Sequence, residues 1–407
     1  MGLPGTAHHN RKARGIVAQE RLNWDDKELP TLHSTLSQIF LTFEGADALH
    51  SQASKWDDLL RRAAPHFEAP GFFLERNWLQ PWLEQRQDVD NFLLAALEDP
   101  STHEWQAALP LYLNPLESGG AVGQRLSVAG FPATDCAFIP AVNEEALQVF
   151  VRKLLHHWAK NIPKAVSFDL RELPQDQATE RALTAWNEDN GDRMHFLTVS
   201  RSPMVMMAEM EAKGGKTTGK LGRNLRSRLR KLEEAGTPDF VFRYLKADEV
   251  ETCYQQFRGI EDQSWKGRDG VGVLGNGNED LMLKVWHNLA GEKRLAAAGL
   301  KLDGELIAYH WGMVCDGVFL SYNLAQLPDY NKLSPGTLLL DYMIHYAGEL
   351  GLTSIDASRG GIDHDHSLSP YKGPIRYHRR AVIYRKTVMG RMLDWRQRRK
   401  VTPTCKD

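Results

Sequence analysis

Two Asp-Gly dipeptides, at 303–304 and 316–317, constrain the fold of this chain more than any other feature. Each lies between runs of apolar residues. Asp-Gly is favoured in the type I′ turn, which needs positive φ at both central positions and joins adjacent antiparallel strands. The pattern therefore predicts a three-strand meander over 295–302, 306–315 and 318–324.

Strand and helix patterns alternate on both sides of this meander. Before it, apolar periodicity predicts a strand over 240–245 and helices over 248–260 and 279–289. After it we expect a helix opened by Pro335 and Gly336, a strand over 353–357, a Gly- and His-rich loop over 358–375 and a last strand over 380–384. This order of elements is mixed and not doubly wound, which disfavours a Rossmann site, and no GxxxxGK[ST] motif of a P-loop occurs.

The first half of the chain has the pattern of a second mixed α/β unit. Residues 1–50 show no persistent periodicity, and we expect a tail there with one short helix near 32–43. The elements expected beyond it are a helix over 70–83, paired strands over 92–97 and 105–113, a helix over 144–160, a strand over 166–170, a helix over 176–188 and a strand over 194–199.

Length and composition indicate a soluble protein of two domains. A chain of 407 residues exceeds the usual size of one domain. No run approaches the ~20 consecutive apolar residues of a membrane span. The four cysteines are scattered without a CxxC pair, which argues against a zinc site, a disulfide framework or a disulfide-linked partner. A reducing cytoplasm is the expected compartment.

The formal net charge of −2 conceals a strong asymmetry. Residues 213–231 hold eight basic side chains and no acidic one, and residues 372–400 hold eleven basic side chains and one acid, Asp394. The rest of the chain therefore carries a net charge of −20. Two basic segments on an acidic body indicate an anionic ligand or surface at particular places.

Several motifs of the second half occur together in one order. They are the basic stretch 221–234 (LGRNLRSRLRKLEE), Ser264-Trp265-Lys266-Gly267, Ser334-Pro335-Gly336, Asp356, Gly360-Gly361 and Tyr371-Lys372. In this order they resemble the FemAB-like branch of the GNAT superfamily, whose members include CelD/BcsL-type acetyltransferases. The resemblance covers residues 220–385. It implies an α/β fold with a mixed (α+β) sheet, made of tandem GNAT-like lobes of which the C-terminal one is better preserved.

The resemblance also divides the chain into expected domains. These are a flexible N-terminal tail (1–50), a degenerate N-terminal GNAT-like lobe (51–205), a basic linker helix (206–235), the catalytic C-terminal GNAT lobe (236–390) and a basic tail (391–407).

Membership of this family implies transfer of an acyl group from a thioester to an amine. Acyl-CoA is then a co-substrate, and no permanently bound cofactor is expected. The reaction needs a base for the attacking ammonium and donors for the oxyanion. Asp356, at the end of a short strand, is the candidate base. His310 is either a second catalytic candidate or a packed core residue, and Tyr371 or Ser264 is the candidate proton donor to the thiolate.

Two groups of residues are candidates for binding the anionic donor. The helix start formed by Ser334, Pro335, Gly336 and Thr337 offers free N–H groups for the CoA diphosphate, although it could be an ordinary capped helix. Arg223, Arg226 and Arg230 share one helix face and could neutralise CoA phosphates or an anionic acceptor. A solvated surface, nucleic acid and a membrane are the alternatives for these arginines.

Glu261, Trp265, Lys266 and Lys372 are the candidate substrate-binding residues. Glu261 would hold an amine, whereas the others would form an aromatic wall with cations beside it, with lobe–lobe packing as the alternative for Trp265. The His and Asp residues of 363–366 are interpreted as a solvated loop, and no metal site is expected.

The acceptor and the function class stay open at this level. The amine could be a long-chain sphingoid base, as for bacterial ceramide synthases, an amino sugar or a peptide, and a lipid acceptor would bring the protein to the anionic inner membrane. An aminoacyl-tRNA donor is the enzymatic variant found among FemAB relatives. The alternative class is a non-catalytic GNAT-fold protein that binds RNA or an anionic membrane; no DNA partner is expected.

Overall fold

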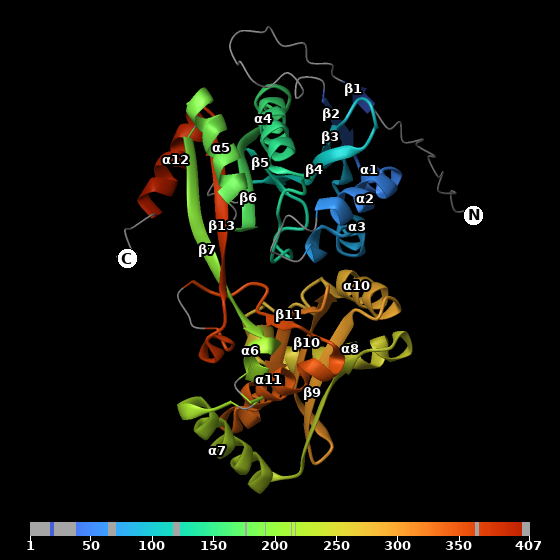
Figure 1. Ribbon diagram of the computed structural model, residues 1–407, viewed down its shortest axis with the longest axis vertical. Helices are drawn as coiled ribbons and strands as arrows, with labels where there is room; N and C mark the ends of the chain where they lie inside the picture. The colour runs from blue at the N-terminus through green and yellow to red at the C-terminus, as the bar shows by residue number, and fades with distance from the viewer. Residues whose placement is uncertain are drawn as a thin grey trace, which may run out of the picture.

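The computed structural model describes residues 17–19, 38–63, 71–116, 123–175, 177–191, 193–212, 214–215, 217–362 and 366–400. Their strands join into one mixed sheet in the order β1-β2-β3-β4-β5-β6-β13-β7-β12-β11-β10-β9-β8. Two lobes share this sheet, the first above and the second below in Figure 1. None of the described helices combines the length and the apolar character that crossing a bilayer requires.

The first lobe contains the N-terminal half of the sheet. Its elements are β1 (Val17–Gln19), β2 (Ile39–Glu44), α1 (Ala48–Ser51), α2 (Ala53–Ala63), η2 (Phe72–Leu74), α3 (Arg76–Glu84), η3 (Val89–Asn91), β3 (Phe92–Glu98), β4 (Trp105–Pro115), β5 (Gln124–Val128), α4 (Glu144–Asn161), β6 (Ala165–Pro174), α5 (Gln177–Asn190) and β7 (Arg193–Met206).

The second lobe follows, and the meander expected from the Asp-Gly turns is confirmed as β9, β10 and β11. Both dipeptides have the positive φ of such turns. The elements are α6 (Met207–Ala212), α7 (Gly219–Ala235), β8 (Pro238–Tyr244), η4 (Ala247–Glu249), α8 (Val250–Gln263), α9 (Trp265–Arg268), α10 (Glu279–Gly291), β9 (Leu295–Leu302), β10 (Glu305–Cys315), β11 (Val318–Gln326), η5 (Pro328–Leu333), α11 (Pro335–Tyr346), η6 (Ala347–Leu350), β12 (Ser354–Asp356), η7 (Ser369–Tyr371), β13 (Ile375–Tyr384) and α12 (Val388–Lys400).

The two lobes repeat one topology. In the first, β2, a group of helices and the antiparallel strands β3, β4 and β5 lead through α4 to β6, which pairs in parallel with β5. In the second, β8, helices and β9, β10 and β11 lead through α11 to β12, which pairs in parallel with β11. The sequences Ser167-Phe168-Asp169 and Ser354-Ile355-Asp356 occupy corresponding strands. The fold is therefore a tandem repeat.

The lobes exchange their last strands. β13, from the end of the chain, lies between β6 and β7 in the first lobe, whereas the end of β7 pairs with β12 in the second. Figure 1 shows β7 and β13 running side by side from one lobe to the other. The last strand of the second half, expected to complete its own lobe, therefore completes the first.

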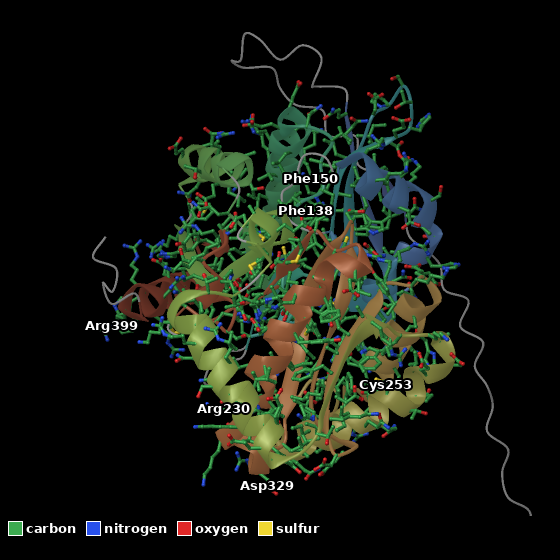
Figure 2. The ribbon with its side chains drawn as sticks, turned by 60° about the horizontal axis from the view of Figure 1, so that its bottom comes forward. Phe138, Phe150, Arg230, Cys253, Asp329 and Arg399 are labelled. Carbon is green, nitrogen blue, oxygen red and sulfur yellow. The ribbon has the colours of Figure 1, made fainter. Side chains whose placement is uncertain are left out.

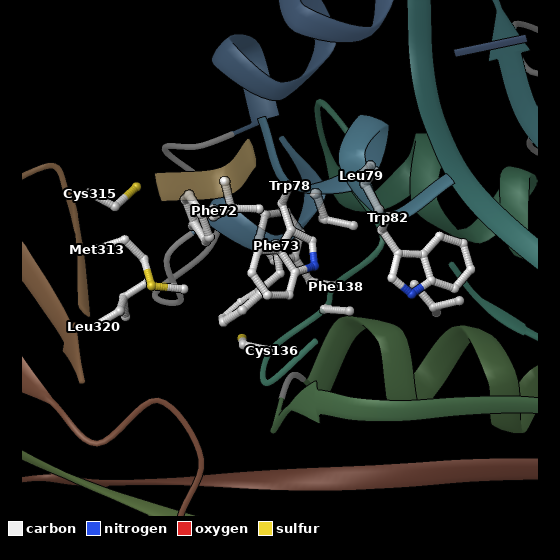
Figure 3. Packing of buried hydrophobic residues seen from close by; sticks show 14 of the residues in the cluster. Phe72, Phe73, Trp78, Leu79, Trp82, Cys136, Phe138, Met313, Cys315 and Leu320 are labelled. Carbon is white, nitrogen blue, oxygen red and sulfur yellow. The ribbon is translucent and has the colours of Figure 1, made fainter. Parts of the chain in front are cut away.

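Aromatic side chains fill the interface between the lobes. The ring of Tyr322 in β11 lies 5.5 Å from that of Trp78 in α3 and 6.0 Å from that of Phe73. Figure 3 shows Met313, Cys315 and Leu320 of the second lobe facing Phe72 and Phe138 of the first. Because aromatic groups bury large areas, this interface joins the buried residues of both lobes into one continuous core.

One expected element is wrong, and others were not anticipated. Residues 39–44 form β2 and not part of a helix over 32–43, because Phe40 and Leu41 are buried against β3; residues 32–37 lie outside the described residues. β2 and α1 also fall within the range 1–50 that the sequence assigns to a tail. The patterns gave no expectation for α2, β5 or α12.

Candidate functional site

The second lobe has a pair of strands that separate. β11 and β12 pair over only three residues each, Val318–Leu320 with Ser354–Asp356. β11 continues to Gln326, whereas the chain after β12 turns to β7, where the N–H of Ala357 donates to the Pro203 carbonyl at 3.1 Å. No described strand pairs with this edge of β11 beyond Leu320. In α/β sheets, ligands bind at such carboxyl ends of strands.

A β-bulge lies where the strands separate. Gly312 pairs with Ser321 and Trp311 with Asn323, so Tyr322 is the extra residue. Bulges re-aim side chains and are frequent next to active sites. The Tyr322 hydroxyl donates to the Ala133 carbonyl at 2.9 Å. A first-lobe loop over 129–142, here called the covering loop, thus lies against the second-lobe site.

A chain of buried polar groups runs from α9 into the sheet. The Lys266 ammonium donates to Asn323 Oδ1, and Asn323 Nδ2 donates to Glu261 Oε1 at 2.5 Å and to the Tyr309 hydroxyl at 3.1 Å. Glu261 is fully buried and also accepts from the Leu274 N–H at 2.7 Å. It therefore holds Asn323, and through it Lys266. Burial lowers the pKa of Lys266 although the carboxylates of Glu261 and Asp135 oppose the shift.

Asp135, in the covering loop, is the titratable group that no sequence motif indicated. Burial raises its pKa to about 6, and the positive charge of Arg359 opposes this shift. Arg359 Nε lies 3.5 Å from Asp135 Oδ1. Ala133, which contacts the bulged Tyr322, lies two residues before Asp135, and the charge of Asp135 acts on Tyr322 and Lys266, so Asp135 lies near the bulge. A carboxyl group with a pKa this close to neutrality suits proton transfer.

Asp356, the candidate base, is engaged in a buried ion pair. Its Oδ2 lies 2.7 Å from Arg376 Nη1, and its Oδ1 accepts from Arg376 Nη2 at 3.0 Å, from Ser202 Oγ at 2.9 Å and from the Ser358 N–H at 2.8 Å. Asp169, the corresponding residue of the first lobe, accepts two hydrogen bonds from Arg380 at 2.7 and 2.8 Å. Both arginines lie on β13. The repetition indicates a structural role for this pair, and the role of base stays a prediction.

The other catalytic candidates also have partners. His310 is buried, its Nε2 lies 2.7 Å from Ser321 Oγ, and burial lowers its pKa to about 3, so the ring is neutral near pH 7. The Tyr371 hydroxyl donates to Asp341 Oδ1 at 2.8 Å, and burial raises its pKa. These contacts place His310 in the sheet and Tyr371 against α11. Their catalytic roles remain predictions.

The start of α11 lies next to the end of β11. The Gly336 N–H donates to Gln326 Oε1 at 2.8 Å, and the N–H groups of Thr337 and Leu338 point to the Ser334 carbonyl at 3.1 and 3.3 Å. The Gln326 amide oxygen thus occupies the position that an anion would take at this helix start, and a diphosphate would have to displace it. A Cβ on Gly336 would lie 2.8 Å from that oxygen, so the Gln326 side chain would have to move to make room for it.

The basic helix α7 packs against α11 and η5. Figure 2 shows Arg230 of α7 and Asp329 of η5 at the same end of the molecule. Arg223 and Arg226 are exposed and form no ion pair within the described ranges, whereas Arg230 lies 3.6 Å from Glu234. The structure therefore places this positive face beside the segment that leads into α11.

The remaining candidates lie at the surface. Trp265 is 57% exposed, and Lys372 is exposed after η7. Of the His and Asp residues of 363–366, those at 363–365 lie outside the described residues. No group of three or more His, Cys, Asp or Glu side chains among the residues that the structure covers could hold a metal ion.

The first lobe differs at the corresponding position. Its α4 begins with Glu144 and Glu145, whereas the first turn of α11 has no acidic residue. Two carboxylates at a helix N-terminus repel a phosphate group. The covering loop also corresponds to the segment between β11 and α11, and it supplies Ala133 and Asp135 to the second lobe. The first lobe thus contributes a wall to the second-lobe site.

Comparisons with known proteins agree with this architecture. Residues 219–373 match the family model described as an acetyltransferase (GNAT) domain. The chain shares its fold with FemX (10% identity, 84% of this chain and 98% of FemX, TM-score 0.54) and with a conserved protein of unknown function from Bacteroides thetaiotaomicron (12%, 82% and 97%, TM-score 0.52). A tandem GNAT protein from the clavulanic acid biosynthesis pathway has a TM-score of 0.45, at 13% identity over 86% of this chain and 99% of that one. No curated protein matches the sequence.

Proposed function

We propose that this protein transfers an acyl group from the thioester of acyl-CoA to an amine, because residues 219–373 match the family model described as an acetyltransferase (GNAT) domain. The amine attacks the thioester carbonyl directly, the new C–N bond forms, and the C–S bond breaks as the thiolate leaves. Acyl-CoA is a co-substrate in this proposal, and no permanently bound cofactor takes part.

The main structural support for this proposal is the separation of β11 from β12. It leaves an edge of β11 without a strand partner, ends at the start of α11 and lies beside the exposed arginines of α7. Backbone N–H groups of this edge can donate hydrogen bonds to the oxyanion. The start of α11 can bind the diphosphate after the Gln326 amide is displaced, and the arginines of α7 can pair with further phosphates. An extended anionic thioester fits this succession of groups.

Asp135 is the base in this proposal. Its position beside the bulge and its raised pKa suit removal of a proton from the attacking ammonium. The ammonium of Lys266, held by Asn323 and Glu261, supplies positive charge on the same side. Asp356, His310 and Tyr371 are the alternatives that the motifs suggest.

The acceptor is a primary amine, for which a sphingoid base and an amino sugar are the leading classes. A lipid acceptor would bring the protein to an anionic membrane surface in the cytoplasm. The C-terminal helix α12 supports that placement, because Trp395 is half-exposed and the Arg399 guanidinium lies 3.7 Å from its ring centroid. An aminoacyl-tRNA donor, or RNA or membrane binding without catalysis, are the competing functions.

The test is thiol release from acetyl-, octanoyl- and palmitoyl-CoA with a mixed pool of amines, with amide products identified by mass spectrometry. Asp135→Asn should lower kcat/KM by ~100-fold or more, the usual contribution of a general base. The control, Asp239→Asn, makes the same change on the exposed part of β8 and should leave the rate unchanged. In the wild type, kcat/KM should rise with pH up to about 6 and then level off. A folded protein that forms no amide from any thioester would refute the proposal.

A further inference from the structure

A cavity of about 690 Å³ opens between the two lobes, outside the polar groups just described. It lies at the other end of β11 from the α11 helix start, because Val318, the first residue of β11, lines it. Its volume falls in the usual range for small-molecule sites. The first lobe contributes Phe138 and residues of α2 and α3, and the second contributes the turn after β10.

The inner wall of this cavity is apolar. Met204 and Met206 of β7, Val318, Cys315 and Phe138 line it. Figure 3 shows Cys315 and Phe138 on opposite sides of the lobe interface. Methionine side chains are flexible and adapt to ligands of irregular shape, so this wall can accept an apolar group.

The charged side chains that line the cavity are largely paired with one another. Arg294 Nη1 and Nη2 contact the two carboxylate oxygens of Glu75 at 2.6 and 2.8 Å. Arg76 pairs with Asp57 at 2.5 Å, and Arg376 with Asp356 at 2.7 Å. A phosphate or an ammonium group inside would compete with these pairs, whereas a neutral group would not. The cavity therefore favours a neutral, apolar ligand.

The cavity extends along β11 towards the proposed site of acyl transfer. Asp356 and Arg376 line the cavity, and Asp356 pairs with Leu320 of β11. Leu320 is two residues from the bulged Tyr322, about 7 Å along the strand. An alkyl chain attached to a group that reacts at the bulge can therefore point towards the cavity, whereas an acetyl group is too short to enter it.

We propose that this cavity binds a long alkyl chain of one of the two substrates. The proposal rests on the proposed function and specifies it: the enzyme acts on a long-chain acyl donor or a long-chain amine. The acyl donor and the amine would each present an alkyl chain to the cavity, and the experiment below distinguishes between these two substrates.

The test compares kcat/KM for dodecanoyl-CoA and acetyl-CoA with ethylamine, and for dodecylamine and ethylamine with acetyl-CoA. Met206→Trp fills the cavity from β7, and Val318→Trp fills it from β11. Val241→Trp, on the exposed part of β8, is the control for the added indole. Both filling variants should lower the long-to-short ratio by at least tenfold for one substrate, and the control should leave it unchanged. A lower ratio for the thioesters identifies the acyl chain, and a lower ratio for the amines identifies the acceptor.

A binding measurement separates failure of this inference from failure of the proposed function. Dodecanol, a neutral alkyl probe, should raise the thermal unfolding midpoint of the wild type and of Val241→Trp, but not that of Met206→Trp. If dodecanol stabilises the wild type and no thioester reacts, the cavity binds an alkyl chain as proposed, but the proposed acyl transfer is wrong. If amides form, but chain length has no effect and dodecanol does not stabilise the protein, the cavity assignment is overturned.

Discussion

At the scale of single residues, the lobe interface contains two buried aspartates with opposite surroundings. Asp356 accepts several hydrogen bonds and forms an ion pair with Arg376, and these contacts fix the position of its carboxyl group. Asp135 lies 3.5 Å from the Arg359 guanidinium, and burial raises its pKa to about 6. Because their environments differ, the two carboxyl groups are suited to different roles: Asp356 to a structural role and Asp135 to acid–base chemistry.

The raised pKa of Asp135 predicts a cost in stability. A folded-state pKa of about 6 lies above the ordinary value of 3.8, so the folded protein binds more protons than the unfolded chain between these values. The free energy of unfolding should therefore fall as pH rises from about 4 to 6, by up to ~3 kcal/mol. Asp135→Asn should lack this fall. Equal pH dependence of the two proteins in urea titrations would contradict the assignment.

The tandem repeat provides a control for Asp356, because Asp169 occupies the corresponding position in the first lobe. Asp356→Asn and Asp169→Asn each leave a buried arginine without its full partner, and each should lower the free energy of unfolding by ~3 kcal/mol. If the pair is structural, the two variants should lose similar activity per folded molecule. A loss at Asp356→Asn that exceeds the loss at Asp169→Asn by 100-fold or more would assign Asp356 as the base.

At the scale of elements, α7 is the part of the proposed donor site with the largest exposed charge. Reversal of two charges in Arg223→Glu/Arg226→Glu should raise KM for acyl-CoA about tenfold, at roughly 0.7 kcal/mol for each exposed charge. The wild-type KM should rise with salt concentration, and that of the variant should rise less. Lys160→Glu/Lys164→Glu, at the exposed end of α4, is the control. Equal effects of both double variants would show that α7 has no specific role.

Local sequence patterns predicted most elements because their signals are local. The Asp-Gly turns set the meander, and Pro335 with Gly336 set the start of α11. The strand exchange and Asp135 could not be found in this way. β13 pairs with strands more than 170 residues earlier, and Asp135 has its altered pKa only because the lobes bury it. Two comparable Ser-apolar-Asp tripeptides were the sequence signal of the repeat.

At the scale of the whole molecule, the second lobe carries the proposed donor site and the first lobe supports it. The exchanged strands β7 and β13 and the shared aromatic core fix the lobes relative to one another. The covering loop can therefore hold Asp135 against the bulge of β11. Two glutamates at the start of α4 and the basic helix α7 in the second lobe make the tandem repeat electrostatically unequal.

Binding of acyl-CoA where β11 and β12 separate can be tested by hydrogen exchange with a non-hydrolysable thioether analogue of acyl-CoA. The backbone N–H groups of residues 322–338 should exchange more slowly with the analogue than without it, and those at the start of α4, residues 144–147, should not change. Slower exchange at the start of α4, or no change at 322–338 at saturating analogue, would contradict it.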